Sequence, residues 1–228
     1  MRSALFVLAV SLGGCGYGLM QTAHTERAGV AVGGTYLKNK LSGVAGRSTD
    51  TALGVVLAPR IGIGDHVDVG VQPWMKPGAR ADVKVDVLAP DNPLALAPRA
   101  GVGYALADSS SHTIMGLAGG IASYRVTRWL EPYLGATYAD HWISRPHQPE
   151  MAQLAPGESL VPRNHTGDGL IELTAGAELR LGRSSGLLAE YNLWLPANND
   201  PGDGYAFVTT HVFALGLHFS TMFQRSPD

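Results

Sequence analysis

The charged side chains that could do chemistry recur at alternate positions of short segments. In the segment Ala79–Val87 every odd position is apolar, and the even positions are Arg80, Asp82, Lys84 and Asp86. A β-strand points successive side chains to opposite faces, so this segment would carry one aliphatic face and one ionic face. The segment Gly169–Leu181 repeats the pattern.

Extending this register along the chain places twelve charged residues on one face of a closed sheet. They are Arg60, Asp68, Arg80, Asp82, Lys84, Asp86, Arg99, Glu131, Glu172, Glu178, Arg180 and Glu190. Two interpretations stay open: a plugged core of salt bridges that stabilises a barrel, or a water-filled pore with charged walls. Unpaired charge inside a narrow barrel is costly, which favours the salt-bridged core.

A metal site is the first alternative for the polar residues outside this face. His141, His147 and His165 gather around the longest predicted loop, beside several acidic residues. Metal ligands must converge on one ion, and no fixed ligand spacing enforces this here. We therefore predict no metal-binding residue and no cofactor.

A hydrolase at the rim of the barrel is the second alternative. Ser110, Ser111 and His112 lie at one predicted rim, and His141 lies at another. Adjacent residues alternate sides of a strand, so closeness in sequence does not set a base against a nucleophile. No Gly-x-Ser-x-Gly motif occurs. We predict no catalytic residue, and an enzyme remains an open alternative.

The elements that would position these residues are about ten strands. The predicted strands span residues 28–37, 51–63, 66–73, 79–88, 94–106, 112–126, 129–139, 169–181, 186–195 and 205–219. Soluble strands average about five or six residues, whereas strands of this length suit a tilted membrane crossing. No stretch beyond the N-terminus is apolar and long enough for a transmembrane helix.

The predicted connections alternate between short and long. Those at one end are 64–65, 89–93, 127–128 and 182–185; those at the other end include 38–50, 140–168 and 196–204. Aromatic residues gather near the strand ends: Tyr36, Trp74, Tyr104, Tyr138, Trp142, Trp194 and Tyr205 at the long-loop end, and Trp129 and Phe219 at the other. Both patterns are typical of barrels with short periplasmic turns and longer extracellular loops.

Composition limits the class of protein. The chain has 228 residues, enough for one domain, with 45% hydrophobic residues, 16% charged residues and 29 glycines. Its net charge is −2, and Lys and Arg are scattered. A nucleic-acid partner is therefore not expected, because such proteins carry a clustered basic face.

The N-terminus is predicted to be an export signal. Arg2 precedes the apolar stretch Ala4–Leu12, which is too short to span a bilayer. The following Leu12-Gly13-Gly14-Cys15 resembles the lipobox of bacterial lipoproteins, which implies that Cys15 is acylated. The alternative is an ordinary cleaved signal in which Cys15 is incidental. We divide the chain into a signal at 1–14, a periplasmic lead at 15–27, a barrel at 28–220 and a tail at 221–228.

Over residues 28–219 the pattern of strands and turns resembles the bacterial outer-membrane β-barrel superfamily. The last predicted strand, Tyr205–Phe219, ends in an aromatic residue, as is common in these proteins. The resemblance implies insertion by the barrel assembly machinery and contact with outer-membrane lipids. Ser220–Asp228 departs from the pattern by following that aromatic. The lead Cys15–Thr25 is similar to those of uncharacterised lipoprotein barrels.

The sequence thus predicts an all-β protein: one closed, antiparallel, transmembrane-type barrel. We expect it in the bacterial outer membrane, anchored by lipid at the periplasmic side, with a structural or surface-interaction role and no specified ligand. Three alternatives remain: a narrow channel for small solutes, an outer-rim hydrolase of envelope lipid or peptide, and a soluble periplasmic lipocalin-like lipoprotein. The last would invert the barrel, with its apolar face inward.

Overall fold

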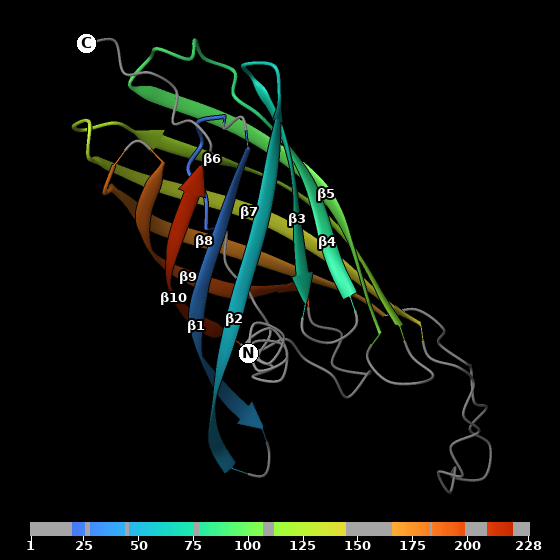
Figure 1. Ribbon diagram of the computed structural model, residues 1–228. Helices are drawn as coiled ribbons and strands as arrows, with labels where there is room; N and C mark the ends of the chain where they lie inside the picture. The colour runs from blue at the N-terminus through green and yellow to red at the C-terminus, as the bar shows by residue number, and fades with distance from the viewer. Residues whose placement is uncertain are drawn as a thin grey trace, which may run out of the picture.

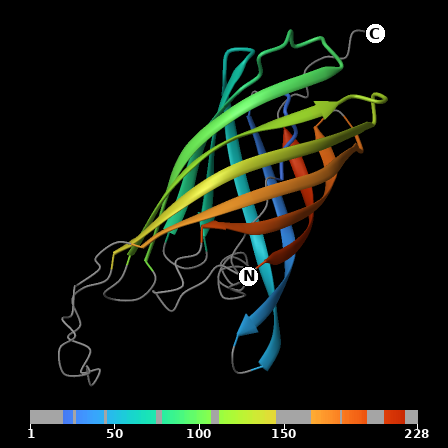
Figure 2. The same ribbon diagram turned by 180° about the vertical axis from the view of Figure 1, so that it is seen from behind.

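The structure is a computed structural model, and it describes ten strands that close into one barrel (Figures 1 and 2). The described residues are 20–25, 28–43, 46–74, 78–106, 112–144, 166–182, 184–198 and 209–220. Within these ranges, no helix has the length and apolar character needed to cross a membrane.

Every strand pairs antiparallel with its sequence neighbour, and β1 also pairs with β10. The strands are β1 Ala28–Gly43, β2 Gly46–Ile63, β3 Val67–Trp74, β4 Gly78–Val85, β5 Leu94–Leu106, β6 His112–Tyr124, β7 Leu130–Ser144, β8 Thr166–Arg180, β9 Ser185–Asn198 and β10 Thr210–Ser220. The β1–β10 seam runs from Gly29 opposite Ser220 to Asn39 opposite Thr210. The predicted fold class, a closed antiparallel barrel of about ten strands, is confirmed.

The two ends of the barrel differ in their connections. We name the end with residues 64–66, 86–93, 125–129 and 181–184 the turn end. The opposite end, which carries residues 145–165 and 199–209, is the loop end. The two longest connections, 145–165 and 199–209, both belong to the loop end, as the sequence predicts. The connections 44–45 and 75–77 at the same end are shorter than 86–93 at the turn end, so the alternation of short and long connections holds only in part.

The first hairpin is longer than the sequence predicts. Residues 38–50 were expected to form a loop, but β1 and β2 stay paired up to Gly43 opposite Gly46. This expectation was wrong because ladder hydrogen bonds join backbone groups and do not require the alternation of apolar side chains. β7 likewise continues to Ser144, past the predicted end at residue 139.

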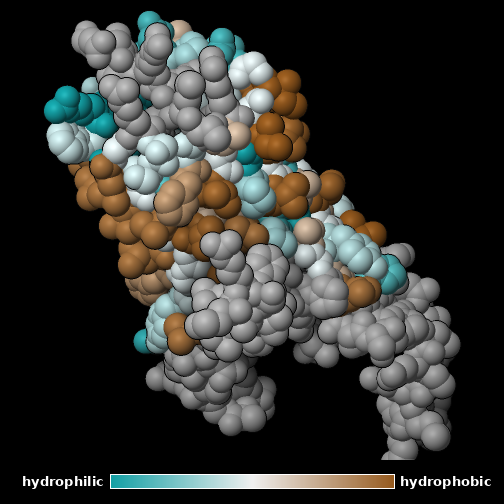
Figure 3. Space-filling view, viewed as in Figure 1, coloured by the Kyte–Doolittle hydropathy of each residue, from teal (hydrophilic) through white to brown (hydrophobic). Residues whose placement is uncertain are grey.

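The two faces of the sheet have opposite chemistry. Large aliphatic side chains point outward and are exposed, as at Leu53 (75%), Val102 (65%) and Leu134 (65%), whereas inward charged side chains such as Asp68 are fully buried (0%). Apolar side chains cover much of the wall in Figure 3. A soluble lipocalin-like barrel requires the reverse arrangement, so the structure contradicts that alternative.

Aromatic residues lie outward at both ends of the wall. Tyr104, Tyr138 and Trp142 are exposed towards the loop end, and Trp129 is exposed at the turn end. Trp194 departs from this expectation: it pairs with Glu172, which points inward, and it therefore shares the luminal register. The period of two fixes its direction, whatever its side chain prefers. The side chain of Trp74 and all of Tyr205 lie outside the described residues.

Candidate functional site

A short stretch of chain fills part of the barrel interior. Residues 20–25, which we name the luminal segment, are each exposed by 5% or less. From the sequence we expected them in a periplasmic lead at 15–27, but they lie inside the barrel. Six wall contacts, described next, hold them there because their backbone and side-chain polar groups match buried polar groups of the wall.

Lys84, on β4, binds the backbone of the luminal segment. Its ammonium donates to the carbonyl oxygens of Thr22 at 2.7 Å and of His24 at 3.0 Å. It also lies 3.1 Å from an Asp68 carboxylate oxygen. Two hydrogen bonds and one ion pair to the ammonium explain how Lys84 is tolerated at 1% exposure.

Glu190, on β9, binds the start of the segment. The Met20 amide donates to Glu190 Oε2 at 2.7 Å, and the Tyr133 hydroxyl donates to the same oxygen at 2.8 Å. Asn192 Nδ2 donates to Oε1 at 2.7 Å. Three donors therefore compensate for the burial of this carboxyl group.

His24 binds the turn end of the barrel. Its Nδ1 lies 2.7 Å from Glu131 Oε1, and its Nε2 lies 3.1 Å from the carbonyl oxygen of Asn92. The two ring nitrogens therefore join the segment to a strand residue and to the turn before β5. Beside it, the Ala23 amide donates to Ser123 Oγ at 3.2 Å.

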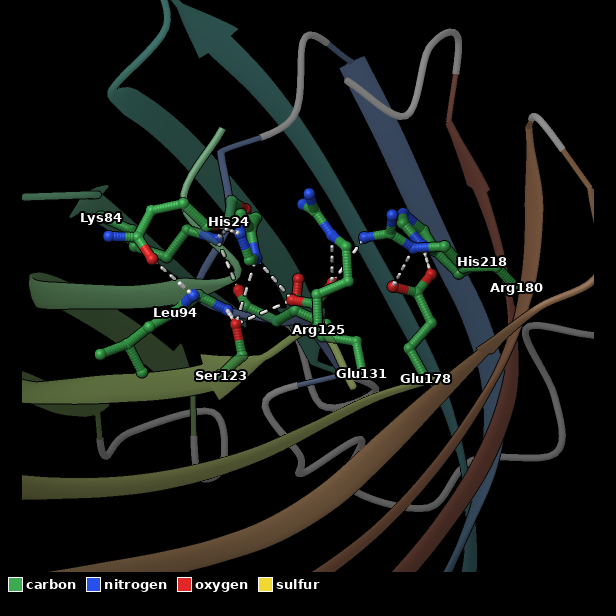
Figure 4. Close-up of polar contacts among 12 residues, drawn as sticks. His24, Lys84, Leu94, Ser123, Arg125, Glu131, Glu178, Arg180 and His218 are labelled. Atoms are coloured by element: carbon green, nitrogen blue, oxygen red, sulfur yellow. Dashed lines mark hydrogen bonds and ion pairs between the residues drawn. The ribbon is translucent and has the colours of Figure 1, made fainter. Parts of the chain in front are cut away.

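Glu131 is the centre of a charged cluster at the turn end (Figure 4). Arg180 Nη2 donates to its Oε2 at 2.6 Å, and Ser123 Oγ donates to its Oε1 at 2.7 Å. Arg125 lies in the turn after β6, and its Nε is 3.8 Å from Glu131 Oε2. Burial, together with the nearby Arg180, lowers the pKa of Arg125. Glu131 thus has a partner on each oxygen.

Glu178 extends this cluster towards the β1–β10 seam. His218 Nδ1 lies 2.7 Å from its Oε1, and Arg180 Nε lies 3.6 Å from its Oε2. Arg180 therefore bridges Glu131 and Glu178, which are directly opposite each other on β7 and β8. Without this bridge, two carboxylates would face each other on neighbouring strands.

A second charged cluster lies along β2 to β5. Arg60 Nε donates to Asp68 at 2.6 Å, and its Nη1 donates to Asp82 at 3.1 Å. Arg99 Nε lies 3.6 Å from the other Asp82 oxygen. Across the lumen, Arg80 Nη1 on β4 lies 3.9 Å from Glu172 Oε2 on β8. Each acid of this cluster therefore has at least one cation within 4 Å, although two cations, Lys84 and Arg99, are directly opposite each other on β4 and β5.

The structure places all twelve charges of the sequence analysis on the luminal side. Eleven are 8% exposed or less, and the side chain of Arg180 is 12% exposed. Five further partners were not predicted from the sequence: His24, Ser123, Tyr133, Asn192 and His218. The period of two marks Tyr133 and Asn192, which have the parity of Glu131 and Glu190 in the same strands. None of the twelve charges lies in β6 or β10 to mark Ser123 or His218, and no strand pattern marks His24.

The luminal segment and the wall leave a small cavity between them. A cavity of about 10 Å³ beside Gln21, Arg60 and Arg80 has room for about one water molecule. Glycine makes room for the segment: a Cβ at Gly216 would lie 2.3 Å from Met20 Cε. Likewise, a Cβ at Gly176 would lie 2.4 Å from the Tyr133 ring. Larger residues at these positions would displace what they face.

The geometry does not assemble a rim hydrolase from the predicted histidines. His141 is opposite Met115, a buried inward residue, whereas His112 stacks on outward Tyr104 with ring centroids 5.9 Å apart. The two histidines thus lie on opposite faces. Ser110, Ser111, His147 and His165 lie outside the described residues. Within the described part of the chain, no three metal-ligating side chains converge.

Comparison with known proteins finds similarity in fold only. No family model matches the chain, and no curated protein matches it. Among solved structures, Neisserial surface protein A is 14% identical over 85% of this chain and 96% of its own, with a TM-score of 0.41. Ail of Yersinia pestis is 14% identical over 86% of this chain and 99% of its own, with a TM-score of 0.35. The outer membrane protease OmpT from Escherichia coli is 9% identical over 88% of this chain and 99% of its own, with a TM-score of 0.48.

The class of protein rests on the barrel itself. A closed antiparallel ring with an aliphatic exterior and an ionic interior is a transmembrane-type β-barrel. More particularly, it is a ten-stranded barrel of this type in which residues 20–25 of the same chain occupy part of the lumen.

Neutralising Glu131 tests the cluster at the turn end. Glu131→Gln should lower the free energy of unfolding by about 3 kcal/mol, because Arg180 and His24 lose their shared acceptor charge in a buried site. Glu172→Gln is the matched control, since its Arg80 partner is 3.9 Å away. Urea unfolding of the refolded protein measures both. Equal losses would contradict a special role for Glu131.

Filling the space at Gly216 tests the seat of the luminal segment. Gly216→Leu should displace Met20, so the amides of residues 20–25 should exchange hydrogen much faster. Its Cβ would also lie 2.9 Å from the Val32 carbonyl oxygen across the seam, so heat-dependent gel migration first checks that the variant barrel still closes. Gly34→Leu is the control, because a Cβ there would meet nothing closer than 3.8 Å. Unchanged exchange in Gly216→Leu, measured by mass spectrometry, would show that the segment is not seated against β10.

Proposed function

We propose that this protein spans the bacterial outer membrane as a closed, lipid-anchored barrel with a structural or surface-interaction role. The observation that carries the proposal is the outward aliphatic face, since exposed side chains such as Leu57, Leu173 and Leu217 would be unfavourable in water. In a bilayer the same face is matched to hydrocarbon, and the closed ring leaves no unpaired sheet edge.

The connections at the two ends of the barrel support one orientation of the barrel in the membrane. In barrels of this class, short turns face the periplasm and longer loops face outward. We therefore assign the turn end to the periplasm and residues 145–165 to the cell surface, where they would make surface contacts. Insertion by the barrel assembly machinery is part of this proposal, because β10 carries an outward aromatic, Phe219, next to its end.

The lipid anchor is proposed at Cys15, from the preceding Leu-Gly-Gly. Four residues lie between Cys15 and Met20, and the five Cα–Cα steps that join them span at most about 18 Å. An acylated Cys15 would therefore lie within about 18 Å of the start of the luminal segment. Feeding cells an alkyne-tagged fatty acid should label the wild type and leave Cys15→Ser unlabelled. Equal labelling of both would remove the anchor.

Single introduced cysteines test the membrane orientation. Pro156→Cys should react with a membrane-impermeant maleimide on intact cells, and Asp65→Cys, in an exposed turn, should react only after lysis. Heat-dependent gel migration checks that each variant is folded. Reaction of Asp65→Cys alone on intact cells would reverse the orientation. Reaction of neither until lysis would remove the proposed membrane crossing.

A charge on the outer wall tests contact with hydrocarbon. Leu173→Arg, in the middle of β8, should cost about 2–4 kcal/mol of stability in phospholipid vesicles, because the cation would lie in the bilayer core. Leu181→Arg, just past the turn end of the same strand, should cost about 0–1 kcal/mol. Urea unfolding in vesicles measures both. If the two variants lose equal stability, the wall does not face a bilayer.

A further inference from the structure

The wall of the barrel closes without help from the luminal segment. All ten strands pair in an unbroken ring, and the seam between β1 and β10 joins eleven residue pairs. Residues 20–25 form no part of any strand ladder. The segment is therefore an insert in a completed ring, and its departure would break no pairing between strands.

Each charged group that holds the segment also has a partner in the wall. Lys84 keeps its ion pair with Asp68, and Glu131 keeps Arg180 and Ser123. This second set of partners matters because a buried charge that loses its only partner costs several kcal/mol. For these two anchors, release of the segment leaves no isolated charge.

The anchor at the start of the segment follows the same rule. Glu190 keeps the Tyr133 hydroxyl and the Asn192 amide after the Met20 amide leaves. Ser123, which accepts from the Ala23 amide, keeps its own bond to Glu131. The remaining contact of the segment joins His24 Nε2 to the carbonyl oxygen of Asn92. Asn92 lies in a turn at the end of the barrel, so water can replace His24 as the partner of this carbonyl.

Apolar packing of the segment is modest. Met20 and Ala23 are its members of the buried hydrophobic cluster, which otherwise consists of wall residues such as Ala97, Ile121 and Leu188. Burying one methionine side chain contributes about 1.5–3 kcal/mol, and the alanine contributes less. The segment is thus held by a few hydrogen bonds and one large apolar side chain, an energy that thermal or ligand-driven exchange can overcome.

The lumen left behind would be polar and almost balanced in charge. The described wall carries six cations, Arg60, Arg80, Lys84, Arg99, Arg125 and Arg180. It carries seven acids, Asp68, Asp82, Asp86, Glu131, Glu172, Glu178 and Glu190. Charged walls of both signs favour water and small hydrophilic solutes, without strong selection between anions and cations.

We propose that the luminal segment is a removable plug, and that its displacement opens a narrow, weakly ion-selective passage for small hydrophilic solutes. The proposal rests on the proposed membrane-spanning role. The closed form is the one in the structure, in which the Lys84, Glu190, Ser123, Glu131 and Asn92 contacts hold the segment across the lumen.

Planar-bilayer conductance of the refolded full chain tests the plug. The wild type should be mostly closed. A variant with residues 20–25 replaced by Gly-Ser-Gly-Ser-Gly-Ser keeps the chain length but loses Met20 and His24. Its open probability should rise about tenfold or more, since each lost hydrogen bond is worth about 1 kcal/mol. Its reversal potential in a salt gradient should stay near zero. Met20→Leu, which keeps an apolar side chain, is the control and should remain mostly closed.

A tether separates the plug from a general loosening of the barrel. The Ala23 amide is 3.2 Å from Ser123 Oγ, so Ala23→Cys with Ser123→Cys, in a Cys15→Ala background, can be joined by oxidation or a short bifunctional thiol reagent. Joined protein should show no openings. Reduction, or release of a cleavable reagent, should restore the opening frequency of the unjoined variant.

Three results would overturn the proposal that residues 20–25 are a removable plug. The first is a Gly-Ser variant that migrates as a folded barrel and inserts in vesicles but stays closed. The second is joined protein that conducts like the unjoined form, and the third is a Gly-Ser variant with strong ion selectivity. Failure of the membrane proposal is distinguishable, because then the wild type would not insert in vesicles, whatever the state of the segment.

Discussion

The need to give every buried charge a partner inside a closed ring governs this structure. Closure fixes which side of each strand is the inside, and the period of two then sends every second side chain there. Glu131 and Glu178 face each other across β7 and β8, which would be repulsive without Arg180 between them. The aliphatic exterior is the other half of the same alternation, since the residues between the charges must point outward.

The luminal segment follows from this requirement. The wall presents Lys84, Glu131 and Glu190 to the interior, and residues 20–25 supply acceptors and donors to them through their backbone and the His24 side chain. Glycine at position 216 leaves room for Met20 in a wall that is otherwise tightly packed. The interior is therefore a composite of wall charges and main chain.

Sequence periodicity predicted what depends on strand geometry and failed where other contacts decide. The alternation in Ala79–Val87 sufficed to assign Arg80, Asp82 and Lys84 to one face, because a strand leaves only two directions. It could not find the pairing of Leu41 with Ser48, which backbone hydrogen bonds make without apolar alternation. It could not place His24 either, because that side chain is positioned by Glu131, 107 residues away.

The seam between β1 and β10 has a consequence for biogenesis. The luminal segment directly precedes β1, and the ring around it is complete only when the first and last strands have joined. Once that join is made, the segment has no lateral route in or out and can move only along the barrel axis. Residues 20–25 must therefore be enclosed while the sheet is still open, or be threaded afterwards from one mouth, and the order of these two events determines whether the newly made barrel is first sealed or first open.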